Sequence, residues 1–142
     1  MAPVNIWAVI VAAIVMFVIG GIWYGPVFGK QWMKLVGKSQ ADIDAAKMSG
    51  MGKSYVLMFV GSFIMCFVLA GSIVNAVHFR LPQLGGVGWG IHMAFWTWLG
   101  FVAPVTLGSV LWENKSWKLW FLNNGYYLLS LLVAGLIIGG WM

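Results

Sequence analysis

GFVAPVTLGSVLWENKSWKLWFLNNGYY, residues 100–127, is the stretch that decides the fold. Two apolar segments flank a short polar turn. The charged residues in or beside the turn are Glu113, Lys115 and Lys118, and the tryptophans that flank it are Trp112, Trp117 and Trp120. Charges at a turn with tryptophans behind them are typical of a helical hairpin that ends at a membrane–water interface. The stretch therefore predicts two antiparallel membrane-spanning helices.

The composition extends this prediction to the whole chain. Of its 142 residues, 62% are apolar and 8% are charged, whereas a soluble domain carries about 25% charged residues. A chain of this length cannot bury so much apolar surface in one core, because small domains leave much of their surface exposed. We expect a single all-α, integral membrane domain over residues 1–142.

Four apolar segments are long enough to cross a hydrocarbon layer of about 30 Å as helices. They cover residues 4–24, 53–79, 85–112 and 117–141. Each carries small residues four positions apart, and such stripes let helix backbones approach closely in lipid. The predicted fold is a four-helix bundle of these segments.

The basic residues predict the orientation of the bundle. Five lie between the first two spans and two lie at the turn after the third: Lys30, Lys34, Lys38, Lys47, Lys53, Lys115 and Lys118. The connection between the second and third spans carries only Arg80. The positive-inside rule then predicts a multi-pass protein of the cell (inner) membrane, with both Lys-bearing loops cytoplasmic and both termini outside. The expected partner of these charges is anionic lipid of the bilayer. Nucleic acid is not expected, because no basic run is interleaved with aromatic residues.

A short cytoplasmic surface helix is predicted within the first loop, over Gln40–Ser49. Ser39 followed three residues later by Asp42 is an N-cap pattern, and Gly50 can end the helix. A solvated loop is the alternative.

The fourth span carries Gly135 and Gly139, a GxxxG pair that gives a flat surface for helix packing. The adjoining strip with Ser130 can pack on the third span through the hairpin. The glycine strip is then free for the first helix or for another subunit, and we expect it to meet another subunit.

Polar residues also occur within the third and fourth spans. Pro104 interrupts the third span and frees the carbonyl of Gly100. The polar residues of this region are Thr106, Asn123, Asn124, Tyr127 and Ser130. Buried amides in lipid need partners, so we expect them to tie the third and fourth helices together. A polar-lined path or a binding pocket is the alternative.

Catalytic and metal sites are not predicted. Asp42, Asp44 and Glu113, the three acids, all fall in loops, whereas a proton-coupled transporter usually needs an ionisable group inside the membrane. The single cysteine, Cys66, allows neither an internal disulfide nor a CxxC site. His92 lies on one helical face with Gly88 and Trp89, so it could be an axial ligand of a tetrapyrrole. A histidine that is hydrogen-bonded within the bundle or that faces an outer vestibule is the commoner case, and no cofactor is expected.

Three stretches carry a family resemblance: residues 21–32 (GIWYGPVFGKQW), residues 51–55 (MGKSY) and the hairpin 100–127. Together they resemble the uncharacterised bacterial membrane family catalogued as domain of unknown function seventeen-sixty-one. The resemblance covers essentially the whole chain, although the family often has Ser where this chain has Gly25. It implies four membrane helices and no established activity.

The sequence therefore favours a non-enzymatic membrane protein that acts through helix–helix interaction, as a homo-oligomer or an accessory subunit of a larger membrane complex. A small channel or transporter that uses the region of Asn123, Asn124, Thr106 and Tyr127 is the alternative from another class. A pigment- or haem-binding subunit through His92 is the third.

Overall fold

The computed structural model describes residues 3–79 and 84–142, and the elements in this part of the chain are helices without strands. Two of them, η1 and η2, are single π-helical turns. In chain order the elements are α1 (Ile6–Ile22), η1 (Trp23–Val27), α2 (Gly29–Val36), α3 (Gln40–Met48), α4 (Gly52–His78), α5 (Gly85–Thr97), η2 (Trp98–Val102), α6 (Ala103–Leu111) and α7 (Trp117–Gly140).

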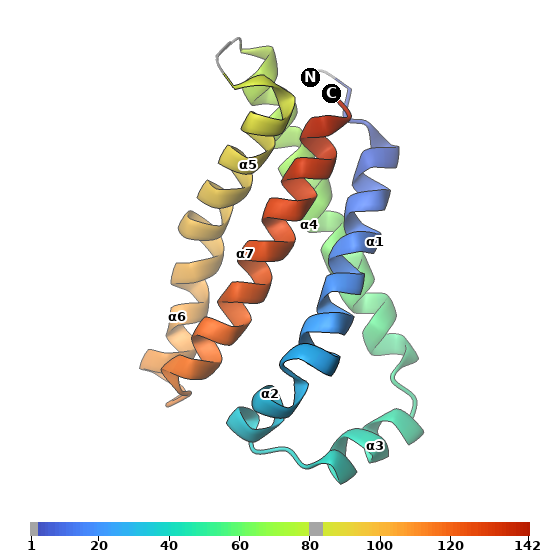
Figure 1. Cartoon of the computed structure of the whole chain (residues 1–142), viewed down its shortest axis with the longest axis vertical. Coiled ribbons are helices and arrows are strands. Elements are labelled where there is room, and N and C mark those ends of the chain that lie inside the picture. The colour runs from blue at the N-terminus through green and yellow to red at the C-terminus, as the bar shows by residue number, and fades with distance from the viewer. Residues whose placement is uncertain (1–2, 80–83) are drawn as a thin grey trace.

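Within residues 3–79 and 84–142, four helical stretches are long and apolar enough to cross a membrane: Ile6–Val27, Gly52–His78, Gly85–Leu111 and Trp117–Gly140. At 1.5 Å per residue, the shortest of them, with 22 residues, reaches about 33 Å. Each coincides with one predicted segment, and the largest difference is at the end of the first, which continues to Val27. The four stretches run side by side (Figure 1).

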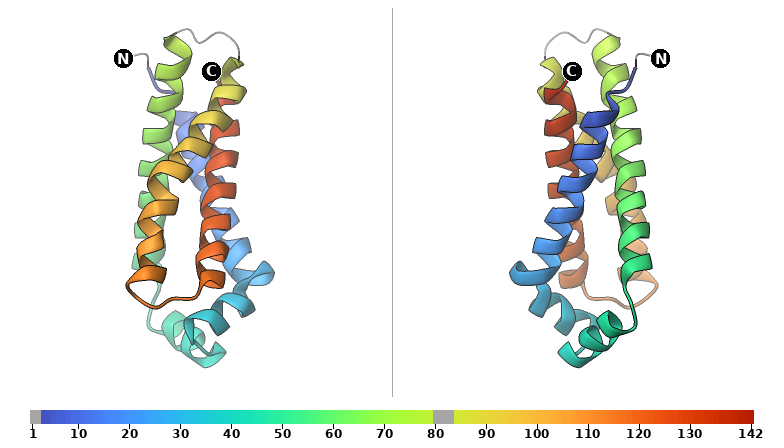
Figure 2. Two further views of the ribbon diagram at one scale, coloured as in Figure 1. Left: turned by 90° about the vertical axis from the view of Figure 1, so that its left-hand side faces the viewer. Right: turned by 90° about the vertical axis from the view of Figure 1, so that its right-hand side faces the viewer.

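The structure brings the lysine-bearing segments to one end of the molecule. The elements α2 and α3 and the turn between α6 and α7 lie at that end, and the start of α1 and the end of α7 lie at the other (Figures 1 and 2). All seven lysines named above belong to the first end. Arg80, which was expected on the opposite side, lies outside the described residues.

The short helix predicted over Gln40–Ser49 is confirmed as α3, which ends one residue earlier, at Met48. The Ser39 N–H donates to Asp42 Oδ2 at 2.7 Å, and the Asp42 N–H donates to Ser39 Oγ at 3.2 Å. This reciprocal pair is a capping box, which satisfies two backbone donors at the start of the helix. Gly50, with φ of 90°, follows the end of the helix.

A second short helix, α2, was not predicted. At Gly25 the backbone leaves the helical region (φ −99°, ψ −105°), and Pro26 follows. The chain then resumes as α2, which ends at Gly37 in the left-handed conformation (φ 72°). Lys30 and Lys34 are exposed on α2, while Trp32 packs edge-to-face against Tyr24 with ring centroids 5.9 Å apart.

The core lies around α7, which contacts α1, α4 and α5. The largest fully buried side chains of the core are Met16, Leu69, Ile73, Leu131 and Ile138. The helix α6 lies apart from this core and packs mainly on α7. The third span is therefore held closely at one end and loosely at the other.

Candidate functional site: a polar cleft between α6 and α7

The contact between α5 and α7 is formed by four glycines. Gly90 faces Gly135 and Gly86 faces Gly139, and a Cβ added at any of the four would collide with the backbone carbonyl of its partner. Only glycine allows backbones to approach this closely. We call this set the glycine contact. The expectation that Gly135 and Gly139 meet another subunit is corrected, because α5 of the same chain covers them.

The geometry changes at η2. The Ala103 N–H donates to the carbonyl of Trp98, five residues back, which is the π-helical pattern. Pro104 follows, and it has no N–H with which to restore the bond to Gly100. A π turn followed by proline redirects a helix, and Figure 2 shows α6 farther from α7 than α5 is.

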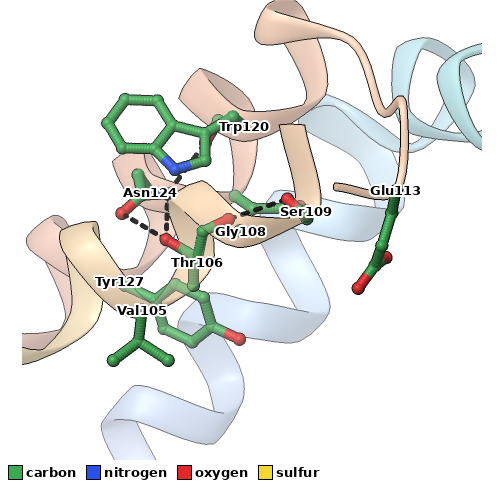
Figure 3. Close-up of a pocket in the computed structure, with 9 residues that line it drawn as sticks. Val105, Thr106, Gly108, Ser109, Glu113, Trp120, Asn124 and Tyr127 are labelled. Carbon is green, nitrogen blue, oxygen red and sulfur yellow. Dashed lines mark hydrogen bonds between the residues drawn. The ribbon is translucent and has the colours of Figure 1, made fainter. Parts of the chain in front are cut away.

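A cleft of about 340 Å³ lies between α6 and α7 beside the hairpin turn. Its lining is Val105, Thr106, Gly108, Ser109, Glu113, Trp120, Asn123, Asn124 and Tyr127 (Figure 3). The volume falls within the range of about 300–1,000 Å³ that is usual for small-molecule sites. Five of the nine lining residues carry polar or charged side chains, namely Thr106, Ser109, Glu113, Asn123 and Asn124, although apolar atoms make up more of the lining surface than polar atoms do. The rest of the outer surface of the four spans is largely apolar.

Thr106 and Asn124 join the two walls of the cleft. The Asn124 Nδ2 group donates to Thr106 Oγ1 at 2.9 Å and to the Trp120 carbonyl at 3.1 Å. The Thr106 hydroxyl donates to the Val102 carbonyl at 2.8 Å. This confirms the predicted tie between the third and fourth spans for Asn124, which is 2% exposed.

Asn123 makes a different tie from the one expected. Its Oδ1 accepts a hydrogen bond from the Tyr24 hydroxyl at 2.9 Å, so its oxygen connects α7 to the end of the first span. Trp23 reinforces this junction, because its Nε1 donates to the Leu122 carbonyl at 3.2 Å. Trp23 also lies over Gly125, where a Cβ would approach the indole ring to 3.2 Å.

Three polar groups of the cleft keep unused hydrogen-bonding capacity. Trp120 Nε1 is buried and has no hydrogen-bond partner among the residues that the structure describes. Both N–H groups of Asn124 are engaged. Its Oδ1 accepts one long hydrogen bond, from Thr106 Oγ1 at 3.4 Å, which leaves one of its two lone pairs unused. Glu113 makes neither an ion pair nor a hydrogen bond within the described part of the chain.

Glu113 differs in this respect from the other two acids. Asp42 accepts from Ser39, and Asp44 accepts from the Gln40 side chain at 3.0 Å. The one acid that lines the cleft is thus the one whose carboxylate has no protein partner among residues 3–79 and 84–142.

The remaining predicted site residues lie in three different places. Tyr127 lines the cleft. Ser130 is fully buried away from the cleft lining, and its Oγ has no hydrogen-bond partner in the described part of the chain. His92 is exposed on α5, with ring centroids 5.2 Å from Trp89 and 6.2 Å from Trp96. Within the described ranges, no group of three His, Cys, Asp or Glu residues could hold a metal ion.

Sequence reasoning missed the part that Glu113, Ser109 and Trp120 play in this site. Trp120 and Asn124 are four residues apart, as are Asn123 and Tyr127, so helical spacing indicated that all four side chains share one face of α7. What the sequence did not reveal is that α6 stands away from that face. The sequence did contain one signal of the site. The third span ends at an acid, Glu113, and the polar face of the fourth span lies across the hairpin turn from it.

Comparison with known families places the chain in one of them. The family described as "Protein of unknown function (DUF1761)" matches residues 7–139. The chain belongs to this family, as the three motifs indicated. Two of those motifs meet in the structure, since Trp23 and Tyr24 of the first bond to Leu122 and Asn123 of the third. No curated protein and no solved structure matches the chain.

Proposed function

We propose that this chain is a non-enzymatic integral membrane protein whose four spans form a bundle, and that it binds a small polar solute in the cleft between α6 and α7 as a small channel or transporter. The cleft carries this proposal. A buried polar atom that lacks a hydrogen-bond partner costs free energy. Trp120 Nε1 is such a group, and a solute would satisfy it.

Solute flux across proteoliposomes tests the proposal. The protein should speed liposome swelling in a gradient of a small polar solute such as urea or glycerol. Ser109→Phe fills the cleft and should reduce that rate to the protein-free value. Leu111→Phe adds an aromatic ring at an exposed position that does not line the cleft, so it should leave the rate unchanged. Equal rates for both variants would argue against the cleft as the solute site.

Assembly with a further subunit remains a second candidate, now through α6 instead of the glycine contact. Phe101 and Val105 are 74% and 76% exposed, and α6 has α7 as its main neighbour. A homo-oligomer or a larger membrane complex would cover this face. Native mass spectrometry of gently solubilised protein tests this candidate, and a purely monomeric protein would exclude a stable homo-oligomer.

We also propose that the lysine-rich end faces the cytoplasm of an inner-membrane protein, with both termini outside. The support is the seven-to-one distribution of basic residues. In a Cys66→Ala background, Gln40→Cys should resist an impermeant thiol reagent on intact cells, and Met142→Cys should react. The opposite labelling would reverse the orientation.

A tetrapyrrole bound at His92 is a third candidate. Absorbance of the purified protein in the visible range tests it.

A further inference from the structure

We infer that the solute bound in the cleft carries an ammonium group, with Glu113 as its counter-ion. This inference rests on the proposed function and adds the charge of the ligand. The protein as a whole has a net charge of +5, yet among the described residues that line the cleft Glu113 is the one that carries a charge. The lining therefore has a formal charge of −1 in a strongly basic molecule.

The neighbouring lysines do not cancel this charge. Lys118 precedes Trp120 by two residues, which turns it by about 200° around α7, away from the cleft. Lys115 lies in the turn, where its backbone N–H donates to the Ser109 carbonyl at 3.0 Å, and its side chain is not part of the lining. Neither forms an ion pair with Glu113 in the described part of the chain.

The other free groups of the cleft suit the same ligand. An ammonium group donates hydrogen bonds and accepts none, so it matches the remaining lone pair of Asn124 Oδ1 and the Glu113 carboxylate. Figure 3 shows the rings of Trp120 and Tyr127 on opposite sides of the Thr106–Asn124 pair. Aromatic faces attract cations through the ring quadrupole. A hydroxyl or ether oxygen next to the ammonium group would accept the unused N–H of Trp120.

Such an ammonium group has two sources, a free small amine or the headgroup of an aminophospholipid. The cleft lies at the hairpin end, where tryptophans cluster as they do at the headgroup level of a bilayer. Both sources share the chemistry of ethanolamine, which has one ammonium and one oxygen function.

Binding of radiolabelled ethanolamine to the full chain in phosphatidylglycerol nanodiscs tests the inference. Glu113→Gln should weaken binding at least tenfold, because it removes the counter-ion. Asp44→Asn makes the same change of charge at the same end of the molecule but outside the cleft, so its affinity should stay within twofold of the original. Equal affinity of the original protein and Glu113→Gln would overturn the inference.

Two further arms identify the source and separate this inference from the proposed function. If the ligand is a lipid headgroup, phosphatidylethanolamine nanodiscs should weaken ethanolamine binding at least tenfold by competition, whereas a free amine should bind equally in both lipids. If radiolabelled urea or acetate binds and Ser109→Phe abolishes it while ethanolamine does not bind, the ammonium inference fails and the solute site stands. If none of the three probes binds, both fail.

Discussion

The third and fourth spans meet in two regions built on opposite principles. In the glycine contact, α5 and α7 approach until backbone meets backbone, and no side chain fits between Gly90 and Gly135. In the cleft, α6 and α7 are held apart, and a hydrogen bond of 2.9 Å between Asn124 and Thr106 bridges them. The π turn η2 and Pro104 separate the two regions. The third and fourth spans thus combine close backbone packing at one end with a cleft at the other.

The largest effect is expected from a side chain in the glycine contact. Overpacking typically destabilises a protein by about 1–3 kcal/mol. Gly90→Leu should have a larger effect, because the new side chain would have to displace the Gly135 backbone and not a flexible side chain. Gly108→Leu lies on the cleft side, where the nearest side-chain atom to a new Cβ is Trp112 Cδ1 at 3.8 Å, and it should change stability little. Thermal unfolding in detergent measures both variants. Should Gly90→Leu not express, Gly90→Ala provides the smaller step.

The next effect concerns the bridge across the cleft. Asn124→Leu removes two donated hydrogen bonds and should lower the free energy of unfolding by about 0.6–1.7 kcal/mol, the range measured for hydrogen bonds between membrane helices. A double-mutant cycle with Thr106→Val should show coupling between the two residues. Strict additivity of the two changes would mean that the 2.9 Å contact does not hold α6.

A smaller effect should separate the two asparagines. Asn123 accepts one hydrogen bond, from Tyr24, so Asn123→Leu should cost about 0.6 kcal/mol, the average for a single membrane hydrogen bond. It should couple to Tyr24→Phe and be additive with Thr106→Val, since Asn123 ties α7 to the first span and not to α6. Coupling of Asn123 to Thr106 instead would remove the distinction between the two ties.

The sequence predicted the features that depend on local patterns. Apolar length located the four spans, and Ser39 with Asp42 located the start of α3, because both signals are contained within one segment. The sequence did not predict the features that depend on how two segments pack against each other. Whether Gly135 faces Gly90 or another subunit depends on helix rotation, which the GxxxG spacing alone does not determine. Likewise, α2, which follows the break at Gly25 and Pro26, was not predicted, because a helix of eight residues is too short to be recognised from its pattern.

The cleft shows the same limit from the functional side. The sequence grouped Asn123, Asn124, Thr106 and Tyr127 as one polar region, and the structure divides them. Asn124 and Thr106 form the bridge, and Asn123 supports the first span. Glu113 was recognised as a loop acid, but its place in the lining depends on the direction that η2 gives to α6. Such a direction follows from the packing of the whole bundle and not from the residues of one turn.

The smallest effect is a pH response confined to α3, outside both regions. The backbone N–H and the hydroxyl of Ser39 each lie 2.7 Å from Asp42 Oδ2 and donate to it, which lowers the pKa of Asp42. Since the pKa is lower in the folded helix than in the unfolded chain, where it is about 3.9, the capping contribution is present above that value. It is lost as the pH falls through the lowered pKa of the folded state. Acidification below this pKa should therefore reduce the helical ¹³Cα shifts of residues 40–48 while those of α7 stay unchanged. Asp42→Asn should abolish the step. A parallel loss of helical shifts in α7 would contradict this prediction. It would show that unfolding of α3 is coupled to unfolding of the four long helices.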